Sequence, residues 1–470
     1  MITKKLLRLS ALLFLIFPLQ AQTKAKYVFF FIGDGMGVNQ VNGTEIYLAA
    51  IDSATGTKPL QFAQFPHSAL VTTFSASSGI TDSAAGGTAL ATGNKTNNGT
   101  LGLKSDQETP VYSLAKMAKD NNLAVGLATT VSIDHATPAA FYAHVESRKM
   151  YHEIGLQLIE AGYDFYAGSD FLEPNGDNGE NLYDQCREAG YTIVRSYGEY
   201  AQKASNADKI ILLQPQAASD FDRTCLPYAI DRTDSDLSLP QITQAAIDFL
   251  EKKSPEGFFL MIEGGKIDWA CHSNDAAAAF NEVIDTDNAV KAALDFYNSH
   301  PDETIIVISA DHETGGLALG TGINELHTDL LRFQRHSAEI FSKMLASEFK
   351  AKGEDFTWDY VRRMLQDNFG FWTDIALSDA ETTELEQAYR DFCDGVAKDT
   401  HTLYADENVI ASKARLLMAK KAHIGWQSDG HSAGYVPVFA VGNGTEAFKG
   451  RIDNTQIPVI IAKLAGYGTE

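Results

Sequence analysis

Short, continuously apolar runs recur along this chain, and helical stretches separate them. Strands with one wet face alternate polar and apolar residues, whereas these runs stay apolar throughout, which is typical of a sheet covered on both faces. Helical patterns such as 111–122 and 275–300 lie between the runs. This alternation predicts a doubly wound α/β fold. We expect buried strands at 27–33, 123–131, 209–214, 257–263, 304–310 and 435–442.

One long segment departs from this alternation. From about 323 to 421 the chain is mostly amphipathic helix, including 329–349 and 407–422. We interpret it as a helical insertion packed over one edge of the sheet. The rest of 22–470 shows no internal repeat and no low-complexity linker, which favours a single domain.

The first 21 residues have the pattern of a secretory signal peptide. Lys4, Lys5 and Arg8 precede an apolar stretch, 11–21, that is too short to span a bilayer. Leu19 and Ala21 suit the −3 and −1 positions of a cleavage site. A core helix is the alternative. We expect an exported protein, with the periplasm the best fit, and no lipid or membrane anchor.

The four cysteines are Cys186, Cys225, Cys271 and Cys393. An exported setting permits disulfides, but four cysteines allow three full pairings. We favour a bridge between Cys186 and Cys225, with free buried thiols as the equal alternative.

The chain is acidic, with 38 basic and 61 acidic residues and a formal net charge of −23. This balance argues against nucleic acid as the main partner. An anionic substrate would be repelled at long range, so a site for one needs concentrated local positive charge.

Side chains that can bind metals follow four of the expected strands. Ligands of open α/β sheets bind beyond the carboxyl ends of the strands, so we expect these side chains to share one site. They are Asp34 after 27–33, His135 and Thr137 after 123–131, Glu263 ending 257–263, and Asp311 with His312 after 304–310.

Two further groups add ligands. Asp268 and His272 are four residues apart in an expected helix, so they share a face and can hold one ion. His431 stands just before the last strand. Histidines with carboxylates suit Zn²⁺, and a carboxylate with a hydroxyl suits Mg²⁺. The other histidines are expected to be surface or core residues: His67, His144, His152, His300, His327, His336, His401 and His423.

Ser83, in "GITDSAAGGTALATG", is a candidate nucleophile, although no histidine lies within ten residues of it in the sequence. At a helix start it would lie in positive potential, and small neighbours would let the helix approach the metal ligands closely. Zinc on the hydroxyl would lower its pKa, so no histidine base would be needed. The alternative is a plain helix cap, a role that Asp82 or Thr81 could fill equally well.

Six motifs together resemble the alkaline phosphatase family: "GDGMG", "TDSAAGGTALATG", "DHATPAAFYAHVESR", "EGGKIDWACH", "SADHETGG" and "DGHSAGYVPVFAVG". The resemblance covers most of the chain outside the helical insertion. It implies a three-layer fold around a mostly parallel sheet and hydrolysis of small phosphate monoesters. It also implies two Zn²⁺ and one Mg²⁺ per chain, and often a homodimer.

The resemblance also implies roles for individual residues. Ser83 would be the nucleophile that becomes phosphorylated, and Arg148 would clamp two phosphoryl oxygens, a bidentate task that arginine suits. The implied ligands are Asp268, His272 and His431 for one zinc, Asp34, Asp311 and His312 for the second, and Asp34, Thr137 and Glu263 for magnesium.

Two positions near the implied site vary within the family. His135 stands where some bacterial members have an aspartate near the magnesium, and it matches the animal enzymes. Trp269 stands where the best-studied bacterial type has a lysine. We expect the first to weaken magnesium binding and the second to weaken phosphate retention.

Two other classes remain as alternatives. A phosphodiesterase, sulfatase or metal-dependent mutase of the same superfamily is one, although "TDSAAGG" lacks the C/S-x-P-x-R context of sulfatases. A non-catalytic phosphate- or metal-binding protein is the other, although every expected ligand is present.

Overall fold

The computed structural model describes residues 24–468, except 178, 323 and 397–398. The expected signal peptide, 1–21, lies outside the described residues. Within the described part of the chain, no helix is both long enough and apolar enough to cross a bilayer.

A ten-stranded sheet forms the centre of the molecule, in the order β16-β2-β15-β8-β1-β7-β3-β4-β6-β5. Only β15 runs against its neighbours, β2 and β8, so the predicted mostly parallel sheet is confirmed. The strands are β1 (Tyr27–Gly33), β2 (His67–Thr72), β3 (Ala124–Thr129), β4 (Phe165–Gly168), β5 (Tyr191–Val194), β6 (Lys209–Leu213), β7 (Phe258–Gly264), β8 (Thr304–Ser309), β15 (Val436–Val441) and β16 (Lys449–Asp453).

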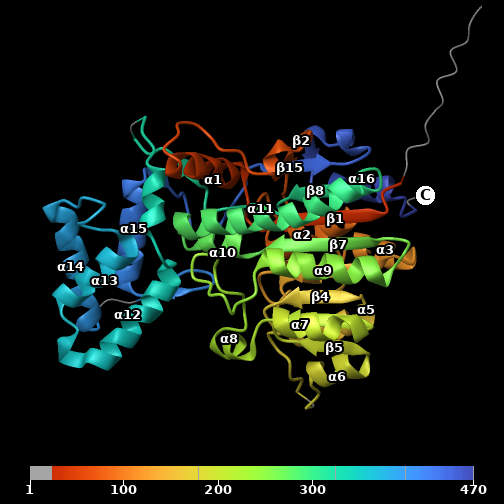
Figure 1. Cartoon of the computed structure of the whole chain (residues 1–470), viewed down its shortest axis with the longest axis horizontal. Helices are drawn as coiled ribbons and strands as arrows, with labels where there is room; N and C mark the ends of the chain where they lie inside the picture. The colour runs from red at the N-terminus through yellow and green to blue at the C-terminus, as the bar shows by residue number, and fades with distance from the viewer. Residues whose placement is uncertain (1–23, 178, 323, 397–398, 469–470) are drawn as a thin grey trace, which may run out of the picture.

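Helices cover both faces of this sheet. Helices α9 and α11 pack together across one face (Figure 1), and α3 and α16 pack on strands from the other. The helices of this part are α1 (Val38–Ile51), α2 (Ser83–Thr92), α3 (Leu114–Asp120), α4 (Ala136–Ala139), α5 (Tyr151–Ala161), α6 (Leu182–Glu188), α7 (Tyr197–Lys203), α8 (Gln216–Phe221), α9 (Leu239–Lys253), α10 (Lys266–His272), α11 (Ala276–Ser299) and α16 (Gln456–Ala465).

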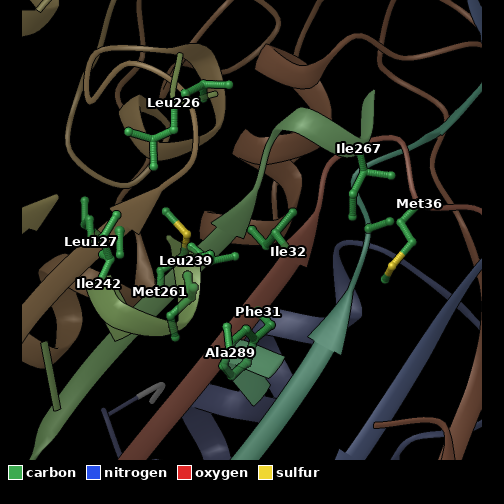
Figure 2. Close-up of a cluster of buried hydrophobic side chains, with 14 of the residues drawn as sticks. Phe31, Ile32, Met36, Leu127, Leu226, Leu239, Ile242, Met261, Ile267 and Ala289 are labelled. Atoms are coloured by element: carbon green, nitrogen blue, oxygen red, sulfur yellow. The ribbon is translucent and has the colours of Figure 1, made fainter. Parts of the chain in front are cut away.

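The central strands are buried along their whole length, and their carboxyl ends are level. Every residue of β1 is buried, and Figure 2 shows Phe31 and Ile32 of β1 among apolar side chains from β7, α9 and α11. In the register of the sheet, Ile32 lies opposite both Glu263 of β7 and Ser309 of β8. Residues that follow these strands therefore emerge side by side.

The segment 323–421 lies beyond the carboxyl ends of the strands, past α10, where Figure 1 shows α12 to α15 gathered together. Its first turn, η3 (Thr328–Phe333), packs on α1 and α11. The rest comprises α12 (Ala338–Lys352), η4 (Gly353–Asp355), α13 (Trp358–Phe369), α14 (Asp379–Cys393), α15 (Val409–Lys421) and the hairpin of β11 (Thr400–His401) with β12 (Asp406–Glu407).

Two short antiparallel ladders join other segments to the main body: one lies at the base of the insertion, and the other contains His431 of the motif "DGHSAGYVPVFAVG". In one, β10 (Ala318–Leu319) pairs with β13 (Ile424–Gly425), on either side of the insertion. In the other, β9 (Glu313–Thr314) pairs with β14 (His431–Ser432). The remaining short turns are η1 (Phe62–Gln64), η2 (Ala204–Asn206) and η5 (Thr445–Ala447).

The favoured disulfide between Cys186 and Cys225 is wrong. All four cysteines are free thiols. Cys186 is buried in α6, whereas the Sγ atom of Cys225 accepts a hydrogen bond from the Nζ atom of Lys266 at 3.0 Å. Each thiol therefore has its own surroundings, and the alternative of free buried thiols holds for three of the four.

Candidate metal centre

Four neighbouring strands, β8, β1, β7 and β3, deliver polar side chains to one place. Asp34 follows β1, Glu263 lies near the end of β7, and Asp311 follows β8. All three carboxylates are 0 % exposed. The level register of these strands brings together the residues that the sequence pattern placed at their ends.

A first group of ligands forms where α10 meets β14. The Nε2 atom of His272 lies 3.3 Å from Oδ2 of Asp268 and 3.1 Å from Nε2 of His431. Atoms that bind a tetrahedral zinc at about 2.1 Å lie roughly 3.4 Å from one another. Both distances are therefore close to the separation expected between two ligands of one zinc ion.

The hydrogen bonds of the two histidines strengthen this interpretation. The Nδ1 atom of His272 contacts the carbonyl of Asp429, and Nδ1 of His431 contacts the carbonyl of Thr81 at 2.8 Å. A carbonyl only accepts, so each Nδ1 carries a hydrogen, and Nε2 is the nitrogen of each ring that is left to bind a metal. The two Nε2 atoms, 3.1 Å apart, therefore lie at about the separation of two ligands of one ion.

A second group surrounds the Nε2 atom of His312. This atom lies 3.4 Å from Oδ1 of Asp34 and 3.2 Å from Oδ2 of Asp311. The Oγ atom of Ser83 lies 3.3 Å from the same nitrogen. Burial lowers the pKa of His312 well below its ordinary value, so its ring is neutral and can bind a metal. The hydroxyl of Ser83 thus shares a potential coordination shell with these ligands.

The start of α2 explains how Ser83 reaches this position. Asp82, not Ser83, is the cap, because its side chain accepts a hydrogen bond from the backbone N–H of Ala85. The alternative of Ser83 as a plain helix cap is therefore wrong. A Cβ atom on Gly86 would lie 3.0 Å from the carbonyl oxygen of Asp311. Glycine at this position lets the helix lie directly against the ligands.

A third group lies between β1, β7 and α4. Ligand atoms of Asp34, His135 and Glu263 all lie within 4.8 Å of one another, and the Oγ1 atom of Thr137 donates a hydrogen bond to Asp34 at 3.4 Å. The Nδ1 atom of His135 is buried without a hydrogen-bond partner. His135 therefore faces this third position directly.

The buried carboxylates need positive charge. Burial and neighbouring carboxylates raise the pKa of Asp34 well above its usual range, and burial raises the pKa of Glu263 to about 7 and that of Asp311 to about 8. Burial also acts on Asp268, but the three nearby histidines lower its pKa. Four carboxylate oxygens lack any hydrogen-bond partner: Asp34 Oδ1, Glu263 Oε1, Asp268 Oδ2 and Asp311 Oδ2. Oxygens of this kind are the ligands that divalent cations take.

Arg148 lies beside these groups. Its guanidinium donates to Oδ2 of Asp82 at 3.2 Å and contacts Nε2 of His135 at 3.1 Å. These contacts hold the positively charged guanidinium of Arg148 next to the start of α2. Desolvation and the positive charge of Arg148 lower the pKa of His135 to about 3, so its ring is neutral.

The structure adds residues that sequence patterns do not reveal. Tyr404, from the hairpin of the insertion, stacks on Trp269 with ring centroids 4.2 Å apart and planes at 5°. Its ring also lies 5.4 Å from that of His272. Nothing in the sequence around Tyr404 indicates that the insertion reaches the centre. Thr129 donates a hydrogen bond to Glu263, and Thr314 donates one to Asp268. Both threonines lie close to motif residues in the sequence, and this position could have identified them as part of the site.

Comparisons with known proteins agree on one family. A family model described as "Alkaline phosphatase" matches residues 25–161 and 166–467. Alkaline phosphatase 3 of Bacillus subtilis (strain 168) is 32% identical over 457 residues, which cover 95% of this chain and 90% of that protein.

Solved structures give the same result. The crystal structure of Thermus thermophilus alkaline phosphatase has a TM-score of 0.78 at 27% identity. The match covers 95% of this chain and 92% of the Thermus chain. A histidine-to-aspartate mutant of the alkaline phosphatase from the Antarctic bacterium TAB5, with Mg bound in its M3 site, has a TM-score of 0.63 at 25% identity. The match covers 95% of this chain and 99% of the TAB5 chain.

The first group of ligands generates a prediction about metal content. We expect His272→Ala and His431→Ala each to lose one bound zinc per chain, because each removes an Nε2 ligand of the same ion. Elemental analysis of the purified proteins measures this. His144→Ala is the matched control, since its Nδ1 also contacts a carbonyl, that of Gly102, at 2.7 Å. Full zinc occupancy in both variants would contradict the assignment.

Proposed function

The chain belongs to the alkaline phosphatase family, a family of metal-dependent phosphomonoesterases, and on that premise we propose that it hydrolyses phosphate monoesters through a phosphoserine at Ser83. The observation that carries this proposal is the position of the Ser83 hydroxyl. It lies at the start of α2, 3.3 Å from Nε2 of His312, inside the ring of buried ligands. A hydroxyl placed there can attack the phosphorus atom of an ester that cations bound to these ligands would attract.

The metal assignment follows from the donor atoms. The first two groups combine imidazole with carboxylate, which suits zinc, and the third adds the hydroxyl of Thr137 to carboxylates, which suits magnesium. We therefore propose zinc with Asp268, His272 and His431, zinc with Asp34, Asp311 and His312, and magnesium with Asp34, Thr137 and Glu263. When bound, such ions lower the pKa of a hydroxyl and neutralise charge on phosphoryl oxygens.

The residues of the chain then have the following tasks. Oγ of Ser83 loses its proton to water and forms a bond to phosphorus as the bond to the ester oxygen breaks, and that oxygen takes up a proton from water and leaves as the alcohol. Water then attacks the phosphoserine, so phosphate leaves and the Ser83 hydroxyl is restored. The start of α2 is the positive end of the helix dipole, which stabilises the negative charge of a phosphoryl group. Arg148, held by Asp82 and His135, can donate to two phosphoryl oxygens at once.

The compartment and the assembly are part of the same proposal. The charged start and short apolar stretch of 1–21 support export, and an exported enzyme would meet its phosphate esters outside the cytoplasm. The possible homodimer remains a prediction from the family resemblance.

Replacing the proposed nucleophile tests the mechanism. We expect Ser83→Ala to lower kcat by at least about a thousandfold, because covalent catalysis is lost, while zinc content stays near the normal value. Acid quenching with radiolabelled substrate should trap a phosphoserine in the wild type and none in the variant. Near-normal turnover of Ser83→Ala would show that the hydroxyl is not the nucleophile.

Arg148 generates a prediction about phosphate binding. We expect Arg148→Ala to weaken binding of substrate and of inhibitory phosphate by about 1.5–3 kcal/mol, the usual range for hydrogen bonds to charged groups. The phosphate affinity of Arg148→Lys should lie between those of Arg148→Ala and the wild type. Lysine keeps the positive charge but lacks the planar guanidinium that binds two oxygens at once. The inhibition constant of inorganic phosphate is the measurement. If this constant is the same in all three proteins, Arg148 does not bind the phosphoryl group.

His135 generates a prediction about the third ion. An imidazole is a poorer partner for hydrated Mg²⁺ than a carboxylate, so we expect His135→Asp to raise magnesium affinity and to lower the need for added magnesium. Activity is measured against magnesium concentration after chelation and zinc reloading, with Trp269 unchanged. His135→Asn separates the effect of charge from that of size. Superimposable curves for the wild type and His135→Asp would contradict the prediction.

A further inference from the structure

A fourth group of metal-binding side chains lies outside the catalytic centre. Among the described residues, four sets of three His, Asp or Glu side chains place their ligand atoms within 4.8 Å of one another, and three of these sets are the groups above. The fourth consists of Glu325, His327 and His423, which we call the neck cluster. Sequence patterns assign both of its histidines to ordinary surface or core positions.

The neck cluster lies where the helical insertion leaves and rejoins the main body. Glu325 and His327 precede η3, and His423 follows α15. The two stretches are already bound to each other, because the N–H of His327 donates to the carbonyl of Ala422 at 3.1 Å and the N–H of Gly320 donates to that of His423 at 3.0 Å. The ligands therefore come from two segments whose backbones hold them together.

The spacing of the neck cluster fits a tetrahedral ion. Oε2 of Glu325 lies 3.4 Å from Nε2 of His327, the separation of about 3.4 Å expected for ligands of one zinc ion. The same kind of separation occurs between His312 and Asp34 in the catalytic centre. The rings of His327 and His423 have centroids 5.1 Å apart and planes at 70°, so both histidines face the same small space.

The hydrogen bonding of His423 also resembles that of the catalytic histidines. Its Nδ1 atom contacts the carbonyl of Glu325 at 3.2 Å. As at His272 and His431, this carbonyl only accepts, so Nδ1 carries the hydrogen and Nε2 is the ring nitrogen left to bind a metal. Histidines that bind metals commonly donate their other ring N–H to a backbone carbonyl in this way.

We propose that Glu325, His327 and His423 bind one divalent transition-metal ion, with zinc as the favoured ion, and that this ion fastens the base of the insertion. Two imidazoles and one carboxylate favour zinc over magnesium or calcium, and water completes the fourth position. The side chains of Glu325 and His327 are 58% and 48% exposed, so the ion exchanges more readily than those of the buried catalytic centre. The proposal does not depend on the function proposed above.

Zinc binding by four matched proteins tests this proposal. Holoenzyme whose catalytic sites are already filled with zinc and magnesium is dialysed against further zinc, and both metals are measured per chain. The variants are His327→Gln, His423→Asn and, as control, His401→Gln. Asparagine is chosen because His423 has a φ of +57°, a left-handed conformation that asparagine tolerates. His401 is exposed on the same insertion, and among the described residues its side chain pairs with one carboxylate, that of Asp406.

We expect the wild type and His401→Gln to bind one more zinc per chain than His327→Gln and His423→Asn. Added zinc should also raise the thermal unfolding midpoint of the first two proteins and leave that of the other two unchanged. Zinc that replaces magnesium at the third catalytic position raises all four zinc contents equally and appears as lost magnesium. Equal zinc contents in all four proteins, or an equal thermal shift, would overturn the proposal.

Discussion

Buried negative charge at the carboxyl ends of the central strands is the constraint on which the rest of the structure depends. Asp34, Glu263, Asp268 and Asp311 are each 0 % exposed, and neighbouring carboxylates of this group raise the pKa values of Asp34 and Asp311. Charges buried together repel strongly because little water screens them, so the group stays fully ionised only with cations between its members. A cation also requires fixed ligand positions, and fully buried strands in level register supply them.

The parts of the chain around the centre fix the ligands from behind. The short ladder between β9 and β14 places His431 opposite Thr314, and Thr314 in turn donates to Asp268. Backbone carbonyls fix which nitrogen of His272 and of His431 is free. The two-stranded ladder therefore determines the position of His431, and the carbonyl of Thr81 determines which of its ring nitrogens is left free.

Sequence reasoning located all six expected strands, because continuous apolar runs mark strands buried on both faces. It missed β4 and β5, which have four residues each, and β2 and β16, whose partly exposed residues give no such run. The ligands that follow strands were predictable because parallel strands end at one edge. Tyr404 and the neck cluster were not, because only the folding of the insertion brings them to their partners.

The insertion also affects the electrostatics of the site. Tyr404 stacks on Trp269 and covers part of the centre, and burial raises the pKa of its hydroxyl well above the ordinary value, so the ring adds no negative charge. Excluding water in this way strengthens the interaction of Arg148 with an anion. The acidic surface repels such an anion only weakly across solution, because salt screens charges beyond about 8–10 Å. A net charge of −23 therefore does not prevent an anion from being attracted at short range, where the guanidinium of Arg148 lies.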